Sequence, residues 1–225
     1  MTQVTVLKIE RPQTLTDIAA NHIREAIIRG DFRLGEALTE ISLSRFLGIS
    51  KTPVREALSS LKREGLIQSD SQKGVRVFTL TADQLHQLCT YRFTLESAAV
   101  DLALENDAEG LCKCLNDICA SMAEARLSGS FDSYLKLDRD FHDAFFEFSG
   151  NQFLKEGYKS VSHKVSTLRT YLSRAPLRTD KSYSEHLEIA KSLKSGRHTE
   201  AKQVLSEQID RGSNALDEIM KKDSL

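Results

Sequence analysis

Residues 35–67 read GEALTEISLSRFLGISKTPVREALSSLKREGLI, and this stretch decides the fold of the first third of the chain. Apolar residues at steps of three and four predict a short helix at about residues 40–47, with Leu43 and Phe46 facing the core. Gly48 ends that helix, and Ser50 caps a longer helix that ends near Gly65. Two helices joined by so tight a turn are typical of a helix-turn-helix.

The sequence on either side completes a small domain. Thr14 has capping-box spacing to an acidic residue and precedes an amphipathic helix that Gly30 closes. Downstream, residues 66–67 and 75–78 predict two short strands joined by a tight polar turn. The order of these elements predicts a winged helix-turn-helix over residues 1–78.

One face of the longer helix is polar and basic, opposite its apolar stripe. The N-terminal residues of this second helix are the ones that enter the major groove, where Arg can fork onto guanine and Lys neutralises phosphate. The alternative is an ordinary solvated face, which any single basic residue there fits equally well. The predicted DNA contacts are Lys51, Thr52, Arg55 and Ser59 on the helix, with Lys62 on the same side, and Lys73, Gly74 and Arg76 in the hairpin.

Charge is distributed unevenly along the 225 residues, although the net charge is only −1. Residues 1–78 carry twelve basic and nine acidic side chains, whereas residues 79–225 carry nineteen and twenty-three. This asymmetry indicates a basic working domain attached to a neutral or acidic one. No apolar run is long enough for a bilayer and no leader is recognisable, so we expect a cytoplasmic protein with no membrane partner.

Residues 79–225 show helical patterns only, beginning with a capping box at Thr81 and Gln84. Three cysteines crowd one of these helices, and the step from Cys112 to Cys114 points their thiols to different faces, which disfavours a zinc site there. The fold class expected is therefore mostly α, with an all-α antiparallel helical bundle after the winged helix. The predicted helices span 82–105, 108–128, 131–148, 152–173, 180–195 and 198–220, with a break near Gly110.

The quoted stretch, together with KGVRVF at residues 73–78, resembles the DNA-binding domain of the GntR family of bacterial regulators, and the segment LGISKTPVREAL is highly specific. The rest of the chain resembles the fatty-acid-regulator branch of that family, whose C-terminal domain is a helical bundle called FCD. The resemblance implies a homodimer that reads a short palindromic operator in double-stranded DNA, and an effector-binding second domain.

Asp138 and His142 lie four residues apart, so carboxylate and imidazole share a helix face and can chelate a divalent metal. The resemblance implies that LDRDFH supplies the first two metal ligands and SEHLEI the third, His186. The fourth position, normally His, is Gln208, whose amide is a poorer ligand for a transition metal such as zinc or nickel. Two interpretations stay open: a metal site of three residues, or a hydrogen-bonded pair in a metal-free pocket. His163 is a candidate substitute ligand.

Arg92 and Glu96, in YRFTLE, match a further family feature. An arginine that points into the bundle would bind the carboxylate of an organic-acid effector. The alternative is an arginine at the surface or paired with Glu96. The effector-binding residues predicted are Arg92, Asp138, His142, His186 and Gln208.

Enzyme signatures are missing from the sequence: there is no nucleophile elbow, phosphate-binding glycine loop, HExxH or dinucleotide fingerprint. We therefore expect a DNA-binding regulator controlled by a small organic acid, and no enzyme. One alternative is a metal-dependent hydrolase or oxygenase that uses Asp138, His142 and His186, which leaves the DNA-binding segment unexplained. The other is an architectural DNA-binding protein without an effector, which leaves the polar residues inside an apolar bundle unexplained.

Overall fold

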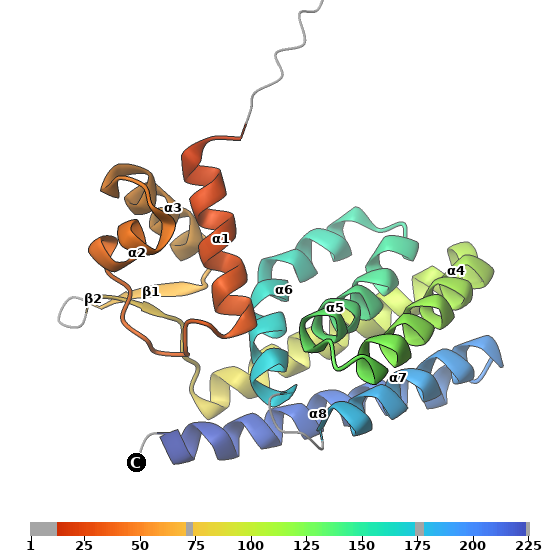
Figure 1. Cartoon of the computed structure of the whole chain (residues 1–225). Helices are drawn as coiled ribbons and strands as arrows, with labels where there is room; N and C mark the ends of the chain where they lie inside the picture. The colour runs from red at the N-terminus through yellow and green to blue at the C-terminus, as the bar shows by residue number, and fades with distance from the viewer. Residues whose placement is uncertain (1–12, 71–73, 174–177, 224–225) are drawn as a thin grey trace, which may run out of the picture.

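The computed structural model describes residues 13–70, 74–173 and 178–223. It has a small N-terminal part of three helices and a hairpin, and a larger bundle of helices (Figure 1). The mostly α fold class and the winged helix-turn-helix followed by a helical bundle are confirmed. None of the described helices is long and apolar enough to span a membrane.

The N-terminal part follows the predicted order. Its elements are α1 (Leu15–Arg29), α2 (Glu40–Leu47), α3 (Lys51–Arg63), β1 (Ile67–Asp70) and β2 (Gly74–Val77), the last two antiparallel. The predicted capping box forms at Thr14, and Gly30 ends α1 in the left-handed conformation. Ser50 is the N-cap residue of α3, but its side chain makes no capping hydrogen bond.

One inward-facing residue was predicted wrongly in this part. Leu43 is buried as expected, but Phe46 is 58% exposed. Its ring lies edge-on to Phe32 with the centroids 5.6 Å apart. Phe32 comes from the loop after α1, so a loop ring, not the domain core, partners Phe46.

The bundle contains α4 (Ala82–Leu127), α5 (Phe131–Phe148), α6 (Gln152–Ser173), α7 (Arg178–Lys194) and α8 (His198–Asp223). The two predicted helices over 82–128 form one element with a kink at Asp107 (φ −155°, ψ 74°), which lies between the predicted ranges and three residues before the break expected near Gly110. The Asp107 carboxylate accepts a hydrogen bond of 2.8 Å from the Gly110 amide, so it caps the second half of α4. A Cβ at Gly110 would collide with this carboxylate and with the Phe148 ring, which explains why glycine occurs there.

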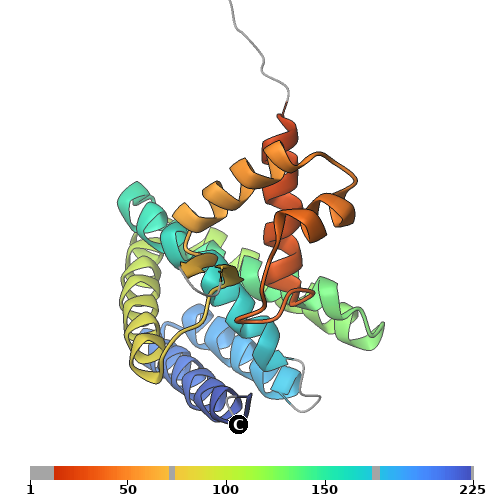
Figure 2. The same ribbon diagram turned by 90° about the vertical axis from the view of Figure 1, so that its left-hand side faces the viewer.

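The two parts share a hydrophobic core. Leu85 of α4, Leu168 of α6 and Leu216 of α8 pack into the cluster formed by the winged helix. Helix α6 lies between the winged helix and the rest of the bundle, in contact with α1 (Figures 1 and 2). The Leu34 amide donates a 2.6 Å hydrogen bond to the Tyr171 hydroxyl across this boundary. Helix α6 is thus the main structural link to the DNA-binding part.

Candidate functional site

The polar face of α3 is exposed as its sequence pattern predicts. Its opposite face packs into the core through Val54, Ala57, Leu58 and Leu61. The four predicted DNA-contacting residues of α3 are all exposed: Lys51, Thr52, Arg55 and Ser59. The structure therefore brings the helical part of the predicted DNA surface together on one side of the molecule.

Arg55 is held in place by the preceding helix. Its guanidinium donates two hydrogen bonds, of 2.7 and 2.9 Å, to the carboxylate of Glu40 on α2. The hydrogen bond from Arg55 is the main reason that the pKa of Glu40 lies below its ordinary value. The Arg55 side chain is still 68% exposed, so the pair orients the arginine while leaving it accessible.

The hairpin agrees less well with the prediction. Lys73 lies outside the described residues, and Gly74 is exposed with φ +74°. Arg76 is half-buried, and its guanidinium donates a 2.8 Å hydrogen bond to the Gly35 carbonyl. It therefore points back onto the loop before α2, and its predicted contact with the DNA backbone or minor groove is not favoured by this geometry.

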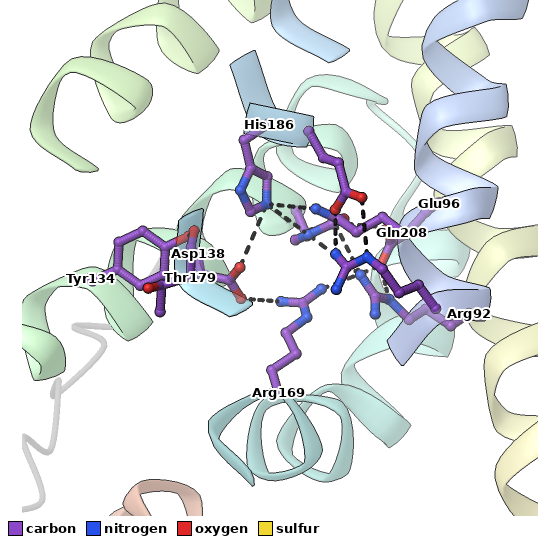
Figure 3. A network of polar contacts seen from close by, with 11 residues as sticks. Arg92, Glu96, Tyr134, Asp138, Arg169, Thr179, His186 and Gln208 are labelled. Atoms are coloured by element: carbon purple, nitrogen blue, oxygen red, sulfur yellow. Dashed lines mark hydrogen bonds and ion pairs between the residues drawn. The ribbon is translucent and has the colours of Figure 1, made fainter. Parts of the chain in front are cut away.

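A cluster of polar side chains is buried inside the bundle, with contributions from five helices (Figure 3). Each of its members is less than one tenth exposed. We call these residues the polar cluster: Arg92 and Glu96 of α4, Asp138 and His142 of α5, Arg169 of α6, His186 of α7 and Gln208 of α8. All the predicted effector-binding residues belong to it.

Two neutral histidines face each other in the polar cluster. Burial lowers the pKa of His142 to about 4 and that of His186 to about 3. His142 Nδ1 is 2.8 Å from Glu96 Oε2, so this nitrogen carries the proton and donates a hydrogen bond to the carboxylate. The pKa of Glu96 is held well below its ordinary value, since Arg92 and His142 outweigh the effect of burial. The lone pair of the ring is consequently on His142 Nε2, which lies 3.4 Å from Arg92 NH2.

The donor atoms around that lone pair suit a divalent metal. His142 Nε2 lies 3.3 Å from His186 Nε2, which in turn lies 3.5 Å from Asp138 Oδ1. Two imidazole nitrogens bound at about 2.1 Å to one tetrahedral ion are about 3.4 Å apart, which matches the observed spacing. Burial opposes the charge on Asp138, but Arg169 and the histidines keep its pKa below the ordinary 3.8. The three predicted ligands thus fit a metal ion in identity and spacing.

Gln208 occupies the expected fourth position. Its amide nitrogen lies 3.5 Å from His186 Nε2, and its amide oxygen is buried without a hydrogen-bond partner among the described residues. The two amide atoms are interchangeable by rotation, so the oxygen can turn toward the histidine instead. His163 lies elsewhere, 3.5 Å from Glu64 of the winged helix, and is not a substitute ligand.

Two arginines enter the polar cluster, and sequence reasoning identified only one. Arg92 Nε donates a 2.6 Å hydrogen bond to Glu96, so the Glu-paired alternative describes this residue. Arg169 was missed because it belongs to no motif that pairs it with the other residues. Its NH1 lies 3.3 Å from Asp138 Oδ2, yet neither terminal nitrogen makes a hydrogen bond within the described structure. A cavity of about 50 Å³ adjoins both arginines.

Comparison with known proteins agrees with both halves of this description. The gntR family of bacterial regulatory proteins matches residues 15–77, and the FCD domain matches residues 87–211. The HTH-type transcriptional regulator YdhC of Bacillus subtilis is 27% identical over 197 residues, which cover 87% of this chain and 88% of that protein. The Nta operon transcriptional regulator of Aminobacter aminovorans is 34% identical over 61% of this chain and 65% of its own length.

Solved structures share the fold. The chain superimposes on Escherichia coli McbR/YncC with a TM-score of 0.75 and 22% identity, over 93% of this chain and 100% of that one. A transcriptional regulator GntR from Rhodococcus sp. RHA1 gives a TM-score of 0.73 and 24% identity, over 89% and 96% of the two chains. The chain belongs to the GntR family of bacterial transcriptional regulators and carries a C-terminal FCD domain.

Proposed function

We propose that this transcriptional regulator binds a small organic acid in the polar cluster, and that the acid changes its affinity for DNA. FCD domains bind small-molecule effectors, and the regulators to which this chain is similar are not enzymes. The observation that supports the cluster as the effector site is the concentration of seven buried polar residues from five helices beside a cavity. Buried polar groups that lack partners are costly, so such a cluster needs a functional reason.

The DNA-binding surface proposed is the exposed face of α3. Lys51 and Thr52 lie in its first turn, where a recognition helix meets base edges and phosphates, and Arg55 follows one turn later. The bond from Arg55 to Glu40 limits the rotamers of the arginine, so less side-chain entropy is lost on binding DNA. An architectural protein would need no such oriented arginine, because sequence-independent binding rests mainly on phosphate charge.

We propose that the protein acts as a homodimer on a palindromic operator, since two winged helices related by a two-fold axis bind two half-sites. Exposed aromatic residues on α4 and α6 support a dimer contact there. Phe153 is 86% exposed and Tyr91 is 41% exposed. The Tyr91 hydroxyl bonds the carbonyl of Gly157, one helical turn beyond Phe153, so both rings lie on neighbouring surface.

The metal, if one divalent zinc or nickel ion is bound, would be held by Asp138, His142 and His186. Its chemical contribution would be to draw the effector carboxylate or a water into the remaining position. The residues themselves set the conditions for this: Glu96 fixes the tautomer of His142, and Gln208 supplies a weak fourth donor. Burial lowers the pKa of His142, so its imidazole is neutral and a proton does not block the nitrogen that faces the other two ligands.

Native mass spectrometry of freshly purified protein tests this proposal, because it reports the dimer, a bound metal and a co-purified acid together. The acid found is then added to a DNA-binding titration. We expect it to change DNA affinity about 5- to 150-fold, the usual range of allosteric coupling. Replacement of His186 by Ala should remove the response while DNA binding without the acid persists. A full response in His186→Ala would place the effector elsewhere.

A further inference from the structure

The most informative residue of the polar cluster is Arg169, which no motif identified. Its side chain rises from α6 between Asp138 and the group around Arg92 (Figure 3). NH1 lies 3.3 Å from Asp138 and NH2 lies 3.6 Å from Glu96, and both nitrogens are buried. Neither makes a hydrogen bond within the described residues, although Arg169 as a whole is only 9% exposed.

Arg92 offers a direct contrast in the same cluster. It donates a short hydrogen bond to Glu96, and its NH2 group lies 3.4 Å from His142 Nε2, the ring nitrogen that carries the lone pair. Its donors are therefore already directed at partners. Buried guanidinium nitrogens almost always have hydrogen-bond partners. A ligand carboxylate whose two oxygens accept from NH1 and NH2 of Arg169 would supply a partner to each of these nitrogens.

A second cavity, larger than the one in the cluster, reaches the same arginine from the DNA-binding side. Its volume is about 220 Å³, and it lies between α1, α5 and α6. Ile28 of α1 and Ser166 of α6 line it, and Asp138 and Arg169 are common to both cavities. A ligand that binds Arg169 from this side would contact the winged helix directly.

We propose that Arg169 is the carboxylate-binding residue of the effector site and that the cavity beside α1 holds the rest of the acid. This inference rests on the proposed function and specifies its ligand. The cavity is smaller than the roughly 300–1,000 Å³ of sites for drug-sized molecules, so the ligand is a small acid and not a long acyl chain. Because α1 forms one wall, a bound acid changes how the winged helix packs against α6.

The test is calorimetric titration of the full-length protein, metal-free and zinc-loaded, with succinate as the probe and the neutral succinamide as its matched control. We expect succinate to bind and succinamide not to. Arg169→Gln should weaken succinate binding at least about tenfold, the loss typical of a charge-assisted hydrogen bond. Lys136→Gln removes an exposed positive charge from the rim of the same cavity, and we expect a change below about threefold because solvent screens it.

Two further variants keep the test decisive if Arg169→Gln folds poorly. Arg169→Lys retains the charge without the fork and should bind succinate with an intermediate affinity. Ser166→Leu fills the cavity beside α1 and should block succinate. Zinc binding should persist, since neither His142 nor His186 lines that cavity.

The outcomes separate this inference from the proposed function. Succinate binding that is equal in wild type, Arg169→Gln and Arg169→Lys would overturn the role of Arg169, while an effector site in the bundle would stand. Succinate binding that survives Ser166→Leu would overturn the role of the cavity. A wild-type protein that binds palmitate but not succinate would overturn the assignment to small acids.

Discussion

Gln208→Ala and Gln208→His together test whether the polar cluster is a metal site with a weak fourth ligand. The Gln208 amide lies 3.5 Å from His186 Nε2 and is buried on α8. A histidine Nε2 extends about as far from the backbone as a glutamine amide, so Gln208→His places an imidazole nitrogen beside the three donors. Neutral imidazole is a much better zinc ligand than an amide, and a fourth protein ligand closes a tetrahedral site.

We expect Gln208→His to raise zinc affinity at least about tenfold, which equals about 1.4 kcal/mol. At saturating zinc the same amount should appear in the free energy of unfolding, because the ion binds the native state. Gln208→Ala removes the amide without adding a donor, so its zinc affinity should equal that of the wild type or lie slightly below it.

The assay is competition for zinc with a chromophoric chelator near pH 7.5, followed by thermal unfolding with and without zinc. His142→Ala in the Gln208→His background is the control, and it should remove the gain. If Gln208→His binds zinc no more tightly than Gln208→Ala, or if the gain persists without His142, the side chains do not bind one ion together. The assignment of the polar cluster as a metal site would then be wrong.

Three other predictions concern the DNA-binding part. Arg55→Ala should weaken binding to a specific duplex about tenfold or more, and Arg63→Ala, exposed in the last turn of α3, should weaken it less; equal losses in gel-shift titrations would point to charge alone. Tyr171→Phe removes the acceptor of the 2.6 Å bond from Leu34 and should cost about 1 kcal/mol, or about 2–4 °C in Tm by calorimetry; an unchanged Tm would show that this contact is unimportant. Burial tends to raise the pKa of Glu64, but two hydrogen bonds from Arg24 hold it below its ordinary 4.5. The contribution of Glu64 to the free energy of unfolding is therefore complete above pH 4.5 and is lost as the pH falls through the lowered pKa. The difference in Tm between wild type and Glu64→Gln should shrink below about pH 4, and a constant difference would contradict the ion pair.

The winged helix could be predicted well because its signals are local. Periodic apolar residues, a capping box at Thr14 and the glycine after α1 each act within a few residues, and all appear in the structure. The prediction that Phe46 faces the core was wrong because its partner, Phe32, comes from a loop whose path the periodicity of α2 does not reveal. Arg76 does not point outward toward DNA for a similar reason: it donates a hydrogen bond to the Gly35 carbonyl, which is 41 residues away in the sequence.

The polar cluster could be predicted only in part. Asp138 and His142 share a helix face, which spacing reveals, and His186 and Gln208 came from the family resemblance. The break in α4 was assigned to Gly110, although the capping residue is Asp107, three positions earlier. That spacing is a capping signal, and it was available in the sequence.

Arg169 had no comparable signal. It meets Asp138 and Glu96 only because α6 packs against α4 and α5. Its sequence neighbours are ordinary helix residues, so nothing local separates it from a surface arginine. Residues that act through packing of distant helices need the tertiary structure to be found.

Selection of binding sites from a randomised pool of DNA duplexes tests the central claim most directly, because it assumes no operator. Full-length protein is used in parallel with Arg55→Ala, and the enriched duplexes are sequenced. A dimer that reads DNA through α3 should enrich one short two-fold symmetric sequence, and Arg55→Ala should lose or alter it. No enrichment by the wild type, or the same sequence enriched by Arg55→Ala, would contradict recognition through this helix.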